Sequence, residues 1–585
     1  MNIEARAFAR VPLSLLTRLR LVLFGHEDLA GVIFWATLVG LCGALASVAF
    51  REGIRFFELL FTGQSAGFVA GAAHLVWWHR ALVPAVGGVL AGCVLHFMGR
   101  ALRSDRSVDY MEAVSVGDGR IGFRATILKS LSSLFSIASG GSIGREGAMV
   151  QLAAMLGSRL GLIAQTPIPR LRLMVACGGA AGIAAAYNAP ISGALFVSEI
   201  VLGSTAMESF GPLVVASVTA NATIHRFLGY GPVFTVPHLH FGSNLELGLY
   251  IVLGVLVGHL APLFLTLLDF ARSRFEGLRL PLYWQLGLGG VVVGVISILA
   301  PEVWGNGYSV VGSILRGELL GPLLLLVLVA KVLATSATVG SGAVGGVFTP
   351  TLFIGCAIGG LVGQILHTLL PTVASDPEVY ALIGMGGFLS ATTLAPLTSI
   401  LMIFEMTLDY DIVLPLMLAC VTAHYTAKVY RHGKSVYHAS LNVPALSQDD
   451  DWRLKTVEAL IKPAIARVSA ATPLAEVFEQ LPRRPLDRVY VMHGEELVAW
   501  LDPREILSQL REGKIDGSLP AGQVARPVSF TLTPGMPLCE ALDGFLRERA
   551  TVLPVTADRW HAALLGEVAR SDVLLAVQDR LTYPK

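Results

Sequence analysis

Residues 139–150 read Ser-Gly-Gly-Ser-Ile-Gly-Arg-Glu-Gly-Ala-Met-Val, and this stretch decides the fold. It places an acidic residue, Glu146, in a glycine-rich turn directly before the apolar run 149–162. An ionisable side chain at membrane depth is costly, so such a residue is by default a candidate for a functional site. The glycines leave backbone amides bare at a helix N-terminus, where an anion binds readily and a carboxylate would compete with it. The alternative is a helix-start carboxylate satisfied by backbone N–H groups and Arg145.

The composition indicates a membrane protein with a soluble tail. The chain has 585 residues, of which 54% are hydrophobic and 15% charged. About a quarter of the residues from 441 onward are charged, against about a tenth before that point, and a soluble domain averages about 25%. The net charge of +1 argues against a nucleic-acid partner.

The membrane part consists of apolar runs that are often too short to span a bilayer. A spanning helix needs about 20 apolar residues, and several runs here are shorter and are separated by glycines instead of polar loops. Such a pattern predicts broken or re-entrant helices, which are tolerated only where their free ends line a site inside the protein.

An internal repeat relates two halves of this region. Residues 189–199 begin with Ala-Pro and end in Glu199, and residues 395–405 begin with Ala-Pro and end in Glu405. Glycine-rich turns precede both segments, at 140–148 and at 342–350. Two related halves with breaks in mid-membrane are typical of a carrier or pore whose site lies between the repeats. The alternative is a coincidence of two Ala-Pro turns.

These segments resemble the CLC chloride channel and transporter family over essentially the whole chain. The turn Gly144-Arg145-Glu146-Gly147-Ala148 is similar to the family's GREGP turn, with alanine in place of proline. The DYMEA stretch at 109–113 resembles the bacterial ClcB-type branch of the family. Residues 346–350 are similar to the family's GxFxP turn, and residues 433–437 to the segment that carries its pore tyrosine. Residues 178–190 and 384–396 resemble the paired segments that start helices in the two halves.

The resemblance implies a polytopic all-α membrane protein with the CLC fold, an inverted repeat of broken and tilted helices, followed by a cytoplasmic α/β tandem CBS domain. Residues 1–28 are expected to form an amphipathic helix on the membrane surface, because arginines and leucines alternate there at helical spacing. The transmembrane domain is expected over 29–444, with halves at about 29–230 and 245–444, and the CBS pair over 449–585.

The resemblance also implies roles for individual residues. Glu146 is expected to be the gating glutamate, whose carboxylate occupies an anion site until it is protonated or displaced. At the central chloride site, the resemblance implies the backbone N–H groups of Val347 and Phe348 and the hydroxyl of Tyr437. At the outer site, it implies the backbone N–H groups of Gly147 and Ala148.

Two departures from the family pattern concern the anion and the proton. A gap-free match places Asp105 at the position of the family's chloride-binding serine, so Ser107 or backbone amides are expected to serve instead. Many proton-coupled members carry a second glutamate immediately after the acid that matches Glu199, and here that residue is Ile200. Glu199 and Glu405 themselves are expected to cap or pair structurally.

The resulting prediction is a chloride-conducting membrane protein, gated at Glu146 and passive like a channel; the alternative is a proton-coupled chloride antiporter. No enzymatic activity, metal site or resident cofactor is expected. An intramembrane metalloprotease needs an HExxH helix, which the sequence lacks, and a divalent-cation transporter needs clustered carboxylates.

The expected setting and partners follow from the same resemblance. They are chloride and possible other anions, protons, the lipid bilayer of a bacterial inner (plasma) membrane and a second copy in a homodimer, with both termini cytoplasmic. In the tail, Asp572 matches part of an adenine-nucleotide motif of CBS domains, with Ala569 replacing its hydroxyl. A structural or dimer-bracing role of the tail is the other interpretation.

Overall fold

The computed structural model describes residues 29–64, 67–98, 108–115, 117–202, 207–229, 231–236, 246–430, 435–436, 456–463, 466–480, 488–511, 515–548, 550–558, 563–570 and 572–573. The chain divides into two compact units, Met1–Asn442 and Val443–Lys585. The amphipathic helix predicted over 1–28 lies outside the described residues.

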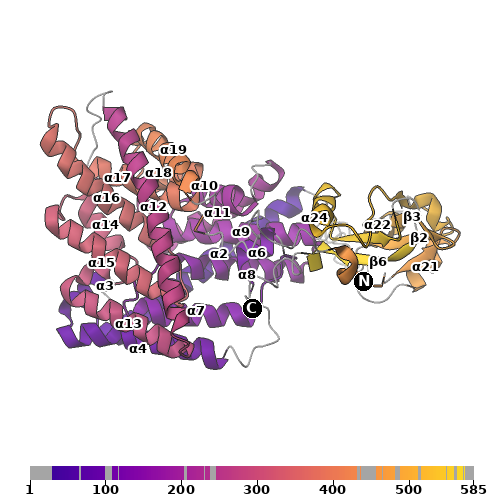
Figure 1. Ribbon diagram of the computed structural model, residues 1–585, viewed down its shortest axis with the longest axis horizontal. Helices are drawn as coiled ribbons and strands as arrows, with labels where there is room; N and C mark the ends of the chain where they lie inside the picture. Colours follow the sequence, from indigo (N-terminus) through magenta and orange to yellow (C-terminus); the bar gives the residue numbers. More distant parts are fainter. Residues whose placement is uncertain are drawn as a thin grey trace, which may run out of the picture. The chain divides into compact units, whose positions relative to one another are not determined.

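The first unit is helical throughout its described residues (Figure 1). The first half of the repeat contains α2 (Leu29–Thr62), α3 (Phe68–His74), α4 (Trp77–Cys93), the π-helix η2 (Val94–Met98), α6 (Tyr110–Ser115), α7 (Phe123–Ala138), α8 (Glu146–Ile163), α9 (Ile168–Tyr187), α10 (Pro190–Phe196), the π-helix η3 (Val197–Leu202) and α11 (Met207–Leu228). The second half contains α12 (Glu246–Gly277), α13 (Leu282–Leu299), the 3₁₀ turn η4 (Pro301–Val303), α14 (Tyr308–Leu315), α15 (Gly321–Gly340), α16 (Phe348–Leu369), α17 (Pro377–Thr393), α18 (Pro396–Thr407) and α19 (Val413–Tyr430).

Seven of the described helices are long and apolar enough to span a bilayer, and α10 and α18 are shorter apolar helices. These short helices are the broken segments that the sequence predicts, and their breaks have the same geometry. The helix before each ends in one left-handed residue, Asn188 with φ 55° and Leu394 with φ 59°. An alanine follows, and the proline at the first helical position starts the short helix because its fixed φ suits that position.

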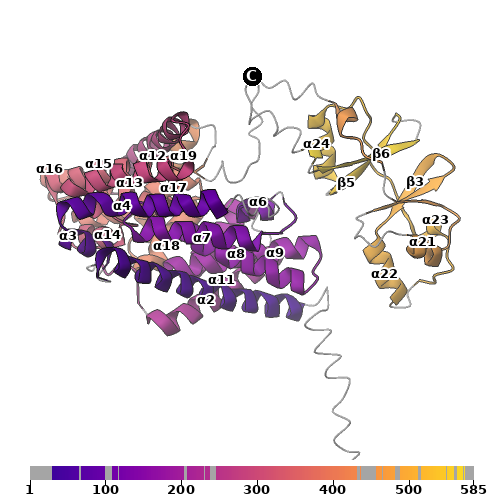
Figure 2. The same cartoon turned by 90° about the horizontal axis from the view of Figure 1, so that it is seen from below.

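Helices of the two halves pack in matching pairs: α8 lies against α9, and α16 lies against α17 (Figure 2). Glycines allow both contacts. A Cβ at Gly178 would meet the backbone of Ala153 and Ala154, and a Cβ at Gly384 would meet the backbone of Gly355 and Gly359. Small residues at these crossings let the backbones approach closely, as in other membrane helix pairs.

The second unit combines short helices with two β-sheets, in which all strand pairs but one are antiparallel among the described residues. Its elements are η6 (Val457–Leu460), β1 (Arg467–Ser469), α21 (Leu474–Gln480), β2 (Val489–His493), β3 (Glu496–Leu501), α22 (Pro503–Arg511), α23 (Ala521–Val524), β4 (Arg526–Pro527), α24 (Leu538–Arg547), β5 (Val552–Thr556) and β6 (Leu564–Ala569). One sheet has the order β1-β2-β3-β4 and the other pairs β5 with β6. β2 pairs antiparallel with β3, and β5 pairs antiparallel with β6.

Candidate functional site

The two glycine-rich turns of the repeat meet each other in the middle of the first unit. The Gly144 amide donates to the Gly346 carbonyl at 2.7 Å, and the Gly346 amide donates to the Gly144 carbonyl at 2.9 Å. This pair of bonds forms an isolated antiparallel bridge. Helix α8 begins two residues after one glycine and α16 two residues after the other, so their N-termini start from the same point.

These two N-termini form an electropositive centre. Each helix start leaves its first amides without a partner inside the helix, and the aligned peptide dipoles add about half a positive charge at each N-terminus. Among the described residues, no side chain caps α8 or α16. Two uncapped helix starts that face one region favour an anion there.

Glu146 is the first residue of α8, and its side chain is only 4% exposed. The Thr349 hydroxyl, from the first turn of α16, donates a hydrogen bond to Glu146 Oε1. No donor among the described residues contacts Oε2, which is fully buried. A buried carboxylate oxygen without a hydrogen bond is costly, so protonation or movement of this side chain would relieve an unfavourable arrangement.

A cavity of about 530 Å³ lies beside these helix starts, and we call it the Glu146 cavity. Four of the predicted site residues line it together, from both halves of the repeat: Glu146, Gly147, Val347 and Phe348. Ala148 is buried in the first turn of α8 and is not among the lining residues. That turn is helical without the family's proline.

Two further predicted residues cannot be placed. Ser107 and Tyr437 lie outside the described residues. Their chain neighbours are described: Ser435 and Val436 line the Glu146 cavity, and the Val436 amide donates to the Thr392 carbonyl at 2.9 Å.

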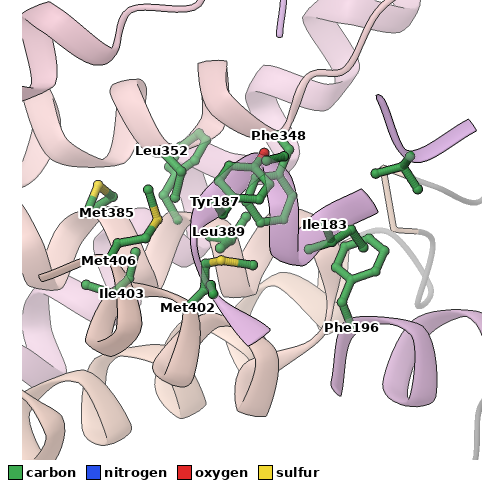
Figure 3. Close-up of a cluster of buried hydrophobic side chains, with 14 of the residues drawn as sticks. Ile183, Tyr187, Phe196, Phe348, Leu352, Met385, Leu389, Met402, Ile403 and Met406 are labelled. Carbon is green, nitrogen blue, oxygen red and sulfur yellow. The ribbon is translucent and has the colours of Figure 1, made fainter. Parts of the chain in front are cut away.

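The apolar wall of the cavity contains residues that the sequence analysis did not single out. Figure 3 shows the rings of Tyr187 and Phe348 close together, with centroids 4.8 Å apart. The Phe196 ring lies 6.0 Å from that of Phe348. Tyr187 lies inside the first helix-start segment, and Thr349 lies inside the GxFxP turn, so the motifs contained both residues. Only the three-dimensional contact between Thr349 and Glu146 identifies the threonine.

A second cavity has a volume of about 730 Å³, and we call it the basic cavity. Arg145 lines the basic cavity, whereas the next residue, Glu146, lines the other. The guanidinium of Arg145 lies over the Tyr308 ring, 5.4 Å from its centroid. The basic cavity is also lined by cationic and polar side chains and by one carboxylate, from Arg51, Arg55, Asn188, His225 and Glu58.

Glu199 and Glu405 each cap the short helix of the opposite half. Glu405 accepts hydrogen bonds from the Ile191 and Ser192 amides at 2.9 and 2.8 Å and from the Ser192 hydroxyl at 2.6 Å. Glu199 accepts from the amides of the matching residues 397 and 398 at 3.4 and 2.9 Å, and from the Thr398 hydroxyl at 2.6 Å. The expected structural role of both acids is confirmed. Ile200 supplies no titratable group next to Glu199 in the chain, whereas His424 of α19 lies within electrostatic reach of Glu199.

Comparison with known proteins agrees with the fold. Residues 87–428 match the family described as voltage-gated chloride channel. The chain is 52% identical over 423 residues to a putative chloride channel protein ClcB-like from Ralstonia nicotianae, covering 72% of this chain and 98% of that protein. It is 42% identical over 408 residues to the voltage-gated ClC-type chloride channel ClcB of Citrobacter koseri, covering 69% and 97%. The chain belongs to the CLC family.

Solved CLC structures share the fold. A slow cyanobacterial Cl⁻/H⁺ antiporter aligns with a TM-score of 0.63 at 24% identity, over 72% of this chain and 99% of that one. A eukaryotic CLC transporter aligns with a TM-score of 0.68 at 20% identity, over 92% and 97%. This is therefore a membrane protein of a family of chloride channels and transporters, whose members are not enzymes.

The α/β architecture of the second unit fits a CBS domain. Its predicted nucleotide-binding residue, Asp572, is paired with a lysine: Lys462 Nζ lies 2.9 Å from Oδ1 and 2.8 Å from Oδ2. The Lys462 backbone pairs in turn with Glu567 on β6. A ribose hydroxyl at Asp572 would have to compete with this ion pair.

Proposed function

We propose that this CLC protein conducts chloride passively and that the Glu146 carboxylate blocks the path between its two cavities. The supporting observation is the place of Glu146. Its buried carboxylate lies at the start of α8 and lines the Glu146 cavity, in the region that two helix N-termini make favourable for an anion, and the preceding residue, Arg145, lines the basic cavity. Protonation removes the negative charge, and chloride can then replace the carboxylate.

In this proposal, chloride binds backbone N–H groups weakly enough to leave again, as conduction requires. The amides of Val347 and Phe348 and the Tyr437 hydroxyl hold the central chloride, and the amides of Gly147 and Ala148 serve the outer one. Ser107 or backbone amides replace the family's serine. Arg51, Arg55 and Arg145 raise the local concentration of anions in the basic cavity, since clefts lined by one sign of charge attract counter-ions.

Passive conduction is favoured over coupling by the chain around Ile200. A proton route through protein needs titratable groups or water. Ile200 supplies no titratable group, and Glu199 is held by α18 through three hydrogen bonds. Proton-coupled antiport is the second candidate, because the similar solved structures include a Cl⁻/H⁺ antiporter and because a carboxylate other than Glu146 lines the same cavity.

The proposed setting is a bacterial inner membrane, with both termini cytoplasmic and two copies in a homodimer. Exposed apolar side chains on and around α18 and α19 offer a face that a second copy would cover, at Leu397, Leu408, Tyr410, Leu414 and Tyr425. The tandem CBS unit over 449–585 is proposed to brace the dimer, because the ion pair of Asp572 with Lys462 disfavours a bound nucleotide.

The experiment that tests the proposal follows chloride and protons together. Purified protein is reconstituted into chloride-loaded liposomes, and chloride efflux and external pH are recorded with and without a potassium ionophore and a proton uncoupler. We expect efflux that depends on the ionophore, with no stoichiometric proton uptake. Uphill proton uptake driven by the chloride gradient would contradict passive conduction and select the antiporter.

A further inference from the structure

Asp109, the first residue of the DYMEA stretch, is a carboxylate in the Glu146 cavity to which neither the family resemblance nor the proposed anion path gives a role. It directly precedes α6 and lines the cavity together with Glu146 and with Asp269 of α12. These three carboxylates differ in exposure. Asp269 is exposed, Asp109 is half-buried and Glu146 is 4% exposed. Asp109 therefore has an environment between open solvent and the buried gate.

The position of Asp109 is fixed to the helix that carries Glu146. The Gln151 side chain of α8 accepts from the Tyr110 amide at 2.9 Å and donates to the Val108 carbonyl at 3.0 Å. These two bonds enclose Asp109 and hold its backbone against α8, five residues beyond the gating glutamate. The backbone of Asp109 cannot move away from α8 without breaking them.

Charged groups on four elements act on Asp109 or share the cavity with it. Lys129 on α7 acts on it as an opposite charge, and Glu112 on α6 as a like charge. Across the cavity, α12 contributes Asp269 and Arg272, and α8 contributes Glu146. Groups of both signs therefore surround the Asp109 carboxylate.

A structural role alone would also explain this aspartate. Asp109 Oδ1 accepts the Met111 amide at 2.9 Å, which caps the six-residue helix α6. The cap needs only an acceptor oxygen, and an asparagine supplies one equally well. The cap therefore does not require a titratable side chain at position 109. Mutation can separate the capping role from a role in proton transfer.

We propose that Asp109 passes protons between the solvent and Glu146 through the Glu146 cavity, an inference that rests on the proposed gating by Glu146. A cavity of about 530 Å³ has room for a chain of waters, each of which takes about 30 Å³ in the liquid. A hydronium ion gives its proton to the Asp109 carboxylate, and the proton then passes by way of water to the Glu146 carboxylate. Asp109 returns to its anionic form, and only O–H bonds form and break.

The proposal makes the gate respond to pH on the side where this cavity opens. Ser435 and Val436, the described residues that precede the tail, line the cavity, so that side is taken as the tail side. The pH on the other side reaches Glu146 through the basic cavity. When the two pH values differ, the protonation of Glu146 depends on how fast protons arrive from each side, and Asp109 controls one of these rates.

The test uses full-length protein in oriented liposomes, where protease added outside shows on which side the tail lies. Chloride efflux is measured while pH is varied on one side at a time. We expect Asp109→Asn to keep the response to pH on the far side. Its response on the tail side should fall at least about tenfold, because positioned proton-transfer groups contribute about 10²–10⁴-fold to a transfer rate. Asp109→Glu should restore it, and Asp269→Asn is the matched control in the same cavity.

The outcomes separate this inference from the proposed function. A wild-type response in Asp109→Asn would overturn the inference and leave gating by Glu146 intact. A defect in Asp109→Ala that Asp109→Asn does not share would also overturn it, because only the cap of α6 would then matter. Glu146→Gln, the control for the gate itself, should respond to pH on neither side; a wild-type response there would contradict the proposed function instead.

Discussion

The two halves of the membrane unit share the breaks before their short and central helices but differ at the residue that begins the central helix. In both halves a helix ends in one left-handed residue, Asn188 or Leu394, and a proline then starts a short helix. The central helices α8 and α16 start from the bridged glycines 144 and 346. The first residue of α8 is Glu146, whereas the first residue of α16 is Phe348. The repeated features build the anion site, and the unmatched residue carries the carboxylate proposed to close it.

The two acids at matched positions of the repeat, Glu199 and Glu405, have structural roles. Glu199 and Glu405 make the same three kinds of hydrogen bond to the short helix of the opposite half. Because each satisfies a helix start that would otherwise be bare, the two acids tie the halves together. The symmetric carboxylates are thus structural, whereas Glu146, which has no matched acid at the start of α16, lines the cavity.

The largest expected effect comes from breaking this reciprocal pair. Glu405 is 6% exposed and its three bonds are short. Glu405→Ala should therefore lower the free energy of unfolding by at least about 3 kcal/mol, since a hydrogen bond to a charged group contributes about 1.5–3 kcal/mol and three are lost. Glu199 is half-buried and one of its bonds is 3.4 Å long. Glu199→Ala should cost about 1 kcal/mol, like the loss of an ordinary helix cap. Denaturant titration in mixed micelles measures both.

Equal decreases in the free energy of unfolding of the two variants would show that burial does not make the Glu405 cap stronger than the Glu199 cap. A larger loss in Glu199→Ala would contradict the comparison. Glu405→Gln, which keeps one acceptor oxygen for the Ser192 group, is the control and should fall between wild type and Glu405→Ala.

A smaller effect is expected from crowding the bridge between the turns. A Cβ at Gly144 would clash with Glu146 Oε2 and stand 2.9 Å from the Gly346 carbonyl oxygen. Gly144→Ala should therefore displace the carboxylate. If overpacking raises the free energy of the closed gate by about 2 kcal/mol, chloride efflux at neutral pH should rise about thirtyfold. Liposome efflux measures this, with size-exclusion chromatography as a check on folding.

Gly346→Ala is the matched variant in the other half. Its Cβ would lie 3.2 Å from the Gly147 amide nitrogen and 3.3 Å from Glu146 Oε2, which neighbours can accommodate by small shifts. The increase in efflux should be clearly smaller than in Gly144→Ala. A folded Gly144→Ala protein with wild-type efflux would mean that the turn does not hold the carboxylate in place.

The smallest effect should follow removal of the one hydroxyl that holds the gate. Thr349→Val keeps the shape of the side chain but deletes the donor to Glu146 Oε1. A hydrogen bond to a charged group contributes about 1.5 kcal/mol at the lower limit, so efflux at neutral pH should increase about tenfold. Thr351→Val is the control, because the Thr351 hydroxyl bonds only the Phe348 carbonyl of its own helix. Equal effects of the two changes would rule out a specific role for Thr349.

Much of this architecture could be predicted from the sequence because it depends on local signals. Glycine-rich turns, Ala-Pro helix starts and apolar runs are readable one segment at a time, and they led to the family and to Glu146. Gly147, Val347 and Phe348 followed from their motifs, and the structure places them around the same cavity as Glu146.

The rest depends on contacts between residues far apart in the chain. The exchange of caps joins Glu199 to Thr398 and Glu405 to Ser192, and the sequence predicted a structural role for each acid but not the crossing. The Thr349 hydroxyl and the Asp109 carboxylate were missed for the same reason. Asp109 lies beside Glu146 only because Gln151 of α8 holds the segment before α6.

The central claim is that the Glu146 carboxylate closes the chloride path until it is protonated or displaced. The most direct test compares chloride efflux from liposomes containing wild type or Glu146→Gln over a range of pH that is equal on both sides. Glutamine resembles the protonated side chain in shape and charge. We predict that wild-type efflux increases as pH falls, whereas Glu146→Gln conducts at every pH. A Glu146→Gln variant with the pH dependence of wild type would contradict the account.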